Sequence, residues 1–190
     1  SLGDLGHGDD TEVFHLCDLE YRAVKHHYGL VRYGLLKTSG QADGFRVLKV
    51  KTAYYAIQNA VSVFNDALEC VSPNTTSTIE GVDKAVIYDW KDRATGTPVV
   101  VFWDASSRPS NDNVVKPGKV TVKGRPVENP VWVDVLTGNV YAISADRVKC
   151  SKGKTVYDVP VYDSPAFVTS MDLLSLDYSW YVREGKNMKK

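Results

Sequence analysis

The 190-residue chain is 43% hydrophobic and 24% charged, an ordinary globular composition that excludes a disordered or low-complexity protein. Lys+Arg and Asp+Glu both number 23, so the formal net charge is zero and no basic excess indicates a nucleic acid or an anionic membrane surface as partner. No stretch approaches the roughly 18 uninterrupted apolar residues that predict a membrane span. The three cysteines lie far apart without a C-x-x-C pair, which excludes a zinc ribbon and a disulfide framework.

The chain opens with Ser1-Leu2-Gly3, and its two methionines are Met171 and Met188. No natural start is visible at the beginning. We therefore expect either a processed product or a piece of a longer protein.

The first predicted strand covers residues 12–18, a short apolar run that is nearly continuous. Such runs are typical of strands covered on both faces, as in a parallel α/β sheet. About 30 residues containing several glycines separate this strand from the next predicted element. Because βα loops usually have about 2–6 residues, a loop this long is normally functional or carries extra elements.

The sequence next predicts a helix from Thr52 to Leu68, with Thr52 as its N-cap. Apolar residues recur there at helical spacing and would form one stripe. The stripe comprises Ala53, Ile57, Ala60, Val61, Phe64 and Leu68. A stripe of this kind needs a surface to pack against, so we expect the helix to be docked.

After residue 78 the apolar period changes to two, which predicts a series of short strands. Residues 99–103 are apolar on both faces, as in a central strand, whereas residues 119–123 alternate between lysine or threonine and valine. Residues 130–136 and 139–143 flank Thr137-Gly138, a hairpin signal. Tyr157, Val159 and Val161 form another alternating set, and residues 166–168 follow.

The sequence thus predicts a mainly β protein: an antiparallel β-sandwich preceded by one strand–loop–helix unit. The polar, proline-containing segment 72–78 resembles a linker. We therefore divide the chain into a strand–long loop–helix segment (1–72), a β-sandwich (73–178) and a polar tail (179–190).

Residues 51–59, Lys-Thr-Ala-Tyr-Tyr-Ala-Ile-Gln-Asn, match the pattern K-P-A-Y-Y-A-x-Q-N except for Thr52 in place of proline. This pattern resembles the opening of the eighth barrel helix in (β/α)₈-barrel glycoside hydrolases of bacteria. Residues 13–19 look like the eighth barrel strand, and residues 28–30 and 33–36 resemble the Y-G-L-L phrase that follows it. Residues 133–141 and 159–165 look like the D-L-L-T-G-x-V-Y and P-V-Y-D-S-P phrases of the C-terminal sandwich.

The resemblance covers roughly residues 10–170 and implies the final βα unit of a barrel followed by an accessory sandwich. A whole barrel needs about 250 residues. The family's two catalytic carboxylates end the fourth and seventh strands, so the resemblance implies that both lie outside this chain. It implies no catalytic residue here, no cofactor, and a periplasmic or secreted location if the parent is a bacterial glycosidase.

Candidate carboxylates near the predicted strand are Asp9, Asp10, Glu12, Asp18 and Glu20. Glycosidic cleavage needs two carboxyl groups at a defined separation. Asp18 ends the presumed barrel strand, on the face where barrel active sites form. We interpret these residues as a solvated acidic loop, with Asp18 as a contact to sugar hydroxyls at the rim.

The four tryptophans could provide a platform on which sugar rings stack, or they could belong to the core. Trp90 and Trp103 follow the inward pattern of their strands, whereas the direction of Trp132 is open because it shares a face with Asp134. Trp180 lies in the polar tail near two tyrosines and is the best exposed candidate for substrate binding.

No metal site is expected. His26 and His27 are neighbours and cannot easily bind one ion together, and His7 and His15 lack a partner at ligand spacing. His15 and Cys17 lie within the apolar run and are interpreted as buried residues, with no motif for a catalytic thiol.

The favoured hypothesis is therefore the C-terminal portion of a glycoside hydrolase-like protein, with no catalytic activity alone. The alternative is a free-standing carbohydrate-binding sandwich, and a purely structural domain is a third possibility. The expected partners are carbohydrate, the upstream barrel of the parent chain, or a second copy bound through the Thr52–Leu68 helix.

Overall fold

The computed structural model describes residues 36–39, 46–71, 74–108, 110, 112, 114–124 and 126–175. The strand expected at residues 12–18 and the tail at 179–190 lie outside these ranges. The elements are β1 (Leu36–Ser39), β2 (Arg46–Val50), α2 (Thr52–Val63), β3 (Leu68–Cys70), β4 (Thr78–Glu80), β5 (Ala85–Asp92), β6 (Pro98–Asp104), β7 (Lys116–Lys123), β8 (Pro130–Asp134), β9 (Val140–Ala142), the 3₁₀ turn η1 (Ala145–Arg147), β10 (Val148–Ser151), β11 (Lys154–Val161), β12 (Ala166–Ser170) and the 3₁₀ turn η2 (Met171–Leu173).

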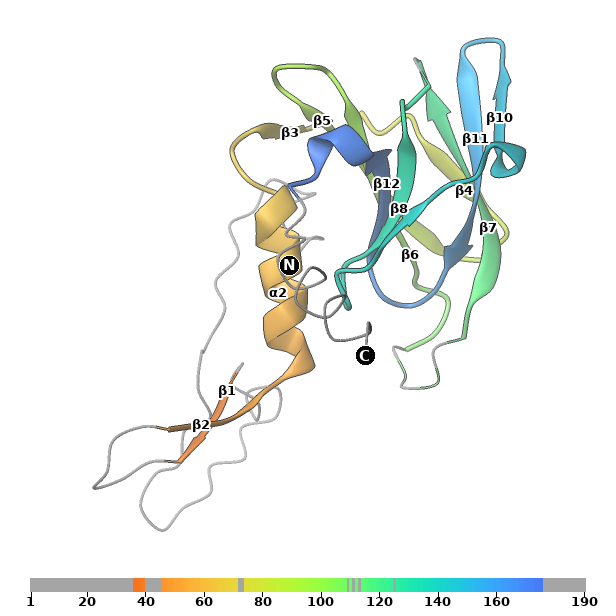
Figure 1. Ribbon diagram of the computed structural model, residues 1–190. Helices are drawn as coiled ribbons and strands as arrows, with labels where there is room; N and C mark the ends of the chain where they lie inside the picture. The colour runs from red at the N-terminus through yellow and green to blue at the C-terminus, as the bar shows by residue number, and fades with distance from the viewer. Residues whose placement is uncertain are drawn as a thin grey trace, which may run out of the picture.

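Two antiparallel sheets face each other, which confirms the predicted β-sandwich (Figure 1). One sheet has six strands in the order β3-β5-β6-β12-β8-β9, and the other has four in the order β10-β11-β7-β4. The chain crosses between the sheets repeatedly, so strands that are neighbours in space are often distant in sequence. For example, β12 lies between β6 and β8.

The main core lies between the sheets. Its largest fully buried side chains are Tyr157 of β11 and Phe102 of β6, both 0% exposed. Valines that alternate with lysine or threonine in β7, Val120 and Val122, complete this layer, as their period-two pattern predicts. The hydroxyl of Tyr157 accepts a hydrogen bond of 2.9 Å from the Val127 amide, which fastens a connecting loop to the core.

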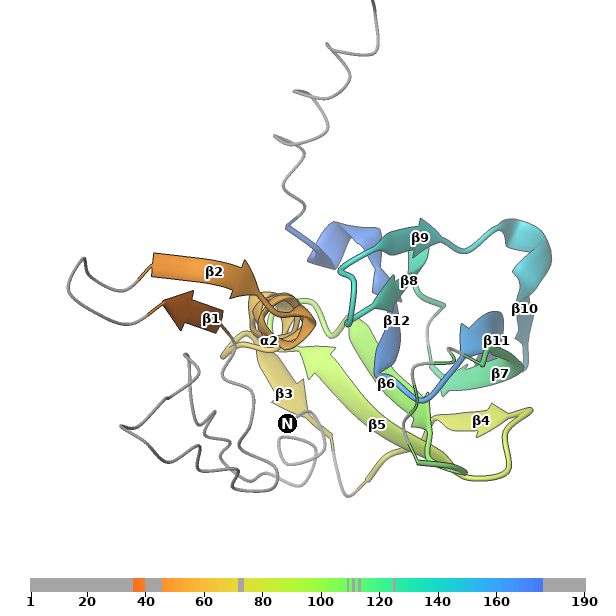
Figure 2. The same ribbon diagram turned by 90° about the horizontal axis from the view of Figure 1, so that it is seen from below.

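A second apolar layer covers the opposite face of the six-stranded sheet. Figure 2 shows α2 on that side, so that the order is helix, six-stranded sheet, four-stranded sheet. Val99 and Val101 of β6 face this layer, whereas Val100 and Phe102 face the main core. This explains why β6 is apolar on both faces, as its sequence predicts for a central strand.

Most strands of the sandwich were predictable from their pattern. β8 and β9 form the expected hairpin around Thr137-Gly138, and β11 alternates as expected, with Thr155, Tyr157, Val159 and Val161 buried. The short strands β3, β4 and β10 carry too few residues for a pattern and were not predicted. β3 lies before the division proposed at residue 72 and pairs with β5.

The predicted helix is too long by five residues. α2 ends at Val63 because Phe64 leaves helical geometry (φ −85°, ψ 82°), and Leu68 begins β3. The N-cap is Lys51, without a side-chain capping hydrogen bond, and Thr52 is the first helical residue. Thr52 therefore occupies the first-turn position that proline favours in helices.

The predicted apolar stripe is also corrected. Ala53 and Val61 are exposed, Val61 by 61%, and none of the α2 residues is fully buried. The other part of the stripe is confirmed: Ala60 and Phe64 pack on the second apolar layer together with Val63, and Leu68 is buried in that layer. Among the described residues, the helix therefore packs on the sandwich through its C-terminal half.

The long loop expected before the helix carries an extra element. β1 and β2 form an antiparallel hairpin, which Figure 1 shows at the N-terminal end of α2, away from the sandwich. In the part of the chain that the structure describes, no helix has the length and apolarity needed to cross a membrane.

Candidate functional site

Three aromatic rings form a row at one open side of the sandwich. Trp132 of β8 and Tyr141 of β9 are directly opposite each other in the hairpin, with ring centroids 5.6 Å apart. Tyr162, just after β11, lies 6.0 Å from Trp132 on a centroid basis. Exposure increases along the row, from 6% for Tyr162 and 8% for Trp132 to 53% for Tyr141. The row therefore leads from the core to the solvent.

An open groove of about 410 Å³ lies over the exposed end of this row. Its walls come from the β9 edge, from η1 and from β11 of the other sheet, so it sits where the chain crosses between sheets. β9 has only three residues and is an edge strand of the six-stranded sheet, and the side chain of Tyr141 on it is exposed. Its lining residues are Trp132, Tyr141, Ala142, Ile143, Ser144, Arg147, Asp158, Val159 and Pro160.

The charged members of the lining are a cation and a carboxylate. Arg147 is exposed at the end of η1, and the Asp158 side chain is 33% exposed with Oδ2 3.7 Å from Lys149 Nζ. Ser144 hydrogen-bonds the side chain of Asp146 and thereby lowers the pKa of that carboxyl. The groove thus presents an apolar aromatic face beside groups that donate and accept hydrogen bonds.

Two lining residues have unmet hydrogen-bonding capacity. Among the described residues, neither Nε1 of Trp132 nor Oδ1 of Asp158 has a hydrogen-bond partner, although both atoms are buried. A buried polar atom without a partner costs about 1–3 kcal/mol. One is a donor and the other an acceptor, and both border the same groove.

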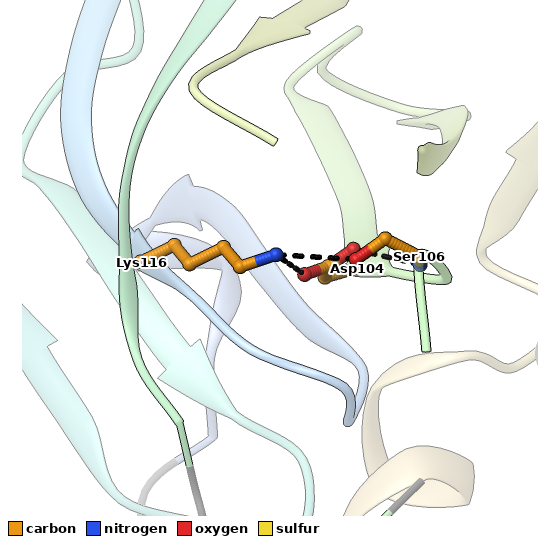
Figure 3. Close-up of polar contacts among 3 residues, drawn as sticks. All are labelled: Asp104, Ser106 and Lys116. Carbon is orange, nitrogen blue, oxygen red and sulfur yellow. Dashed lines mark hydrogen bonds and ion pairs between the residues drawn. The ribbon is translucent and has the colours of Figure 1, made fainter. Parts of the chain in front are cut away.

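A second polar cluster joins β6 to β7 (Figure 3). Lys116 Nζ lies 2.7 Å from Asp104 Oδ2 and donates a 3.1 Å hydrogen bond to Ser106 Oγ. The Ser106 amide donates to Asp104 Oδ1 at 2.8 Å. The hydrogen bond from Lys116, followed by those from Ser106, lowers the pKa of Asp104 to about 2. Asp104 in turn raises the pKa of Lys116. Every polar group in the cluster is paired, so it acts as a structural clamp.

The site residues chosen from the sequence lie largely outside the described ranges. This holds for Asp18 and Trp180, for the other acidic candidates up to Glu20, for the four histidines and for Cys17. Their roles stay predictions. Among the described residues, no group of three or more His, Cys, Asp or Glu side chains could hold a metal ion.

The remaining tryptophans divide between core and site. Trp90 is buried and Trp103 is half-buried in the layer beneath α2, so both belong to the core. The sequence left open which way the side chain of Trp132 points. In the structure it packs in the main core and also borders the groove. Tyr141, Arg147 and Asp158 were not predicted as site residues from the sequence. Counting outward from the Thr137-Gly138 turn could have found Tyr141 opposite Trp132.

No family model matches the chain, and no curated protein matches it. Among solved structures, a rhamnosidase from Novosphingobium sp. PP1Y is similar to it, with 19% sequence identity and a TM-score of 0.35. The match covers 53% of this chain and 9% of the rhamnosidase chain. The chain thus spans a small part of that enzyme's length.

Proposed function

We propose that the chain is the C-terminal portion of a glycoside hydrolase-like protein: the last βα unit of a barrel and an accessory β-sandwich, without hydrolytic activity of its own. The phrases that resemble this family lie on three structural junctions. Residues 51–59 open α2, residues 133–141 form the β8–β9 hairpin, and residues 159–165 end β11 and lead into β12.

One observation carries the proposal: two of these phrases meet in space. Asn59, the last residue of the helix phrase, donates a 3.0 Å hydrogen bond from Nδ2 to the carbonyl oxygen of Val135 in the hairpin phrase. The same amide group lies against Gly138. A helix of a barrel wall and a turn of an accessory sandwich would need such a contact to hold the two parts together.

Five residues after Asn59, Phe64 packs the C-terminal end of the helix on the sandwich. Its ring makes edge contacts with Trp90 and Phe167, at centroid distances of 5.4 and 5.6 Å. The sandwich and the C-terminal end of α2 therefore share one apolar layer. In the parent protein, this layer would carry the sandwich as an extension of the eighth barrel helix.

A hydrolysis assay tests the lack of activity. The purified chain is incubated with a panel of aryl glycosides, and we expect no turnover above the uncatalysed rate because the acid and the nucleophile would lie upstream. Turnover that disappears in Asp18→Asn or Glu20→Gln would contradict the proposal. Sequencing the coding region upstream tests the origin: seven further strand–helix repeats are expected.

The alternative function, a free-standing carbohydrate-binding sandwich, is favoured by the groove beside Tyr141. An upstream region without strand–helix repeats, together with affinity for glycans, would support it. The two functions differ in what precedes the sandwich, and both are compatible with a ligand in the groove.

A further inference from the structure

The groove beside β9 has the form of a binding site for a small ligand. Its volume of about 410 Å³ falls within the range of about 300–1,000 Å³ typical of small-molecule sites. It is open to solvent along the exposed ring of Tyr141. A ligand could therefore enter without a rearrangement of either sheet.

The aromatic row gives this groove a firm apolar surface. Tyr141 leans on Trp132, which is held in turn against Tyr162 in the core. Burial, together with the nearby carboxylate of Asp134, raises the pKa of Tyr162, so this phenol is neutral in the ordinary pH range. A ring supported from behind loses little conformational freedom when a ligand stacks on it.

The polar groups beside the ring define what else the ligand must offer. Arg147 can only donate hydrogen bonds, and the Asp158 carboxylate can only accept them. They come from different elements, η1 and β11, and both border the groove with Tyr141. A ligand that satisfies both needs groups that donate and accept, next to an apolar face.

We propose that this groove binds a neutral sugar residue, whose apolar ring face stacks on Tyr141 while its hydroxyls bond to Asp158 and Arg147. Hydroxyl groups both donate and accept, and the C–H face of a pyranose is apolar, so one saccharide residue meets all three requirements. Arg147 and Asp158 give the lining opposite charges, so the groove has no charge excess that would favour an acidic or a basic ligand over a neutral one. The proposal goes beyond the proposed function, which requires no ligand on this face.

Binding is tested with the full 190-residue chain. An array of neutral glycans, acidic glycans and short peptides is screened first. The best neutral glycan is then titrated as its methyl glycoside, with the indole N–H signal of Trp132 followed by NMR. We expect saturable binding and a shift of this signal. The signal is assigned to Trp132 by its absence from the spectrum of Trp132→Phe. Binding confined to acidic glycans or to peptides, or to no probe at all, would overturn the proposal.

Variants of Tyr141 and Asp158 test whether the ligand binds at these two side chains. Tyr141→Ala should weaken binding roughly tenfold or more, because a central aromatic contact is lost. Tyr141→Phe should retain most of the affinity, since the ring remains. Asp158→Asn should weaken binding by roughly fivefold to tenfold, because a charged acceptor becomes a neutral one.

A matched control comes from α2. Tyr55 is 49% exposed, comparable to Tyr141 at 53%, but lies outside the groove. Tyr55→Ala should leave the affinity unchanged. If it weakens binding as strongly as Tyr141→Ala does, the site is elsewhere and the proposal fails. The hydrolysis assay is independent of this outcome, so failure of the sugar site and failure of the proposed function can be told apart.

Discussion

Gly138 of the β8–β9 turn lies directly against the side-chain amide of Asn59 in α2, so a larger residue at position 138 would have to displace that amide. A Cβ atom added to Gly138 would lie 2.8 Å from Asn59 Oδ1. Gly138 also has a φ of +76°, a conformation that L side chains rarely adopt. The glycine therefore serves two purposes: it allows the turn, and it allows the helix to dock.

Gly138→Ala should destabilise the protein by about 1–3 kcal/mol, the sum of backbone strain and loss of the helix contact. Gly153→Ala is a matched control, because Gly153 has a φ of +73° but a Cβ there meets nothing within 4 Å. Urea denaturation measures both free energies of unfolding. The excess cost at Gly138 should disappear in an Asn59→Ala background; an excess that persists would show that the helix contact is irrelevant.

Phe64→Ala tests the apolar contact between helix and sandwich. The half-buried ring touches Trp90 and Phe167, so its removal should cost about 2–4 kcal/mol, slightly less than a fully buried phenylalanine. Thermal unfolding and sedimentation are measured together. Val61→Ala, at a position 61% exposed, should change neither.

Self-association of two copies of the chain through α2 would give a different result. If the wild type dimerises through α2, Phe64→Ala should reduce association and cost little stability. A monomeric wild type with an unchanged midpoint in Phe64→Ala would contradict both docking and self-association.

Asp104→Asn tests the clamp between β6 and β7 through its pH dependence. The pKa of about 2 in the folded state lies below the ordinary aspartate value of 3.8, so the carboxylate stabilises the fold above about pH 4. This contribution is lost as the pH falls from about 4 to 2. At pH 7 the variant should be less stable than the wild type by about 1–2 kcal/mol.

Urea denaturation of wild type and Asp104→Asn at pH 7, 4 and 2 should show a difference that shrinks toward the lowest pH. Other carboxylates titrate in both proteins and cancel in the comparison. If the difference in the free energy of unfolding is constant across this range, Asp104 stabilises the fold through packing and not through its negative charge.

Tyr157→Phe removes one buried hydrogen bond without changing the ring. The Val127 amide, which donates to the tyrosine hydroxyl at 2.9 Å, would lose its partner, and the expected cost is about 1–3 kcal/mol. Hydrogen exchange at Val127 should accelerate relative to the wild type. Tyr55→Phe, at a half-exposed tyrosine, serves as the control and should have no effect on either measurement.

The sandwich was predictable because its strands repeat with period two over enough residues to show it. Val120 and Val122 alternate with lysine and threonine in β7, and β11 follows the same rule. The helix end was not predictable from periodicity, since Leu68 continues the helical spacing by coincidence while pairing with Asp92 in a strand. The pairing of β3 with β5 therefore determines that Leu68 lies in a strand.

The groove was harder to predict because it is a product of topology. Tyr141 and Asp158 belong to different sheets, and 17 positions of chain separate them. Only the crossing through η1 brings both to one depression. Tyr141 also lies on the edge strand of the six-stranded sheet, a position that depends on the strand order and that no local pattern encodes.

The position of β12 in the middle of the larger sheet has a consequence for synthesis. All five residues of β12 are buried, and the strand supplies the pairing edge for both β6 and β8. Until residues 166–170 have left the ribosome, β3-β5-β6 and β8-β9 are separate pieces with unpaired, apolar edges. A nascent chain would carry these edges while the residues between β6 and β12 are synthesised, and interception by a chaperone at that stage would favour folding over aggregation.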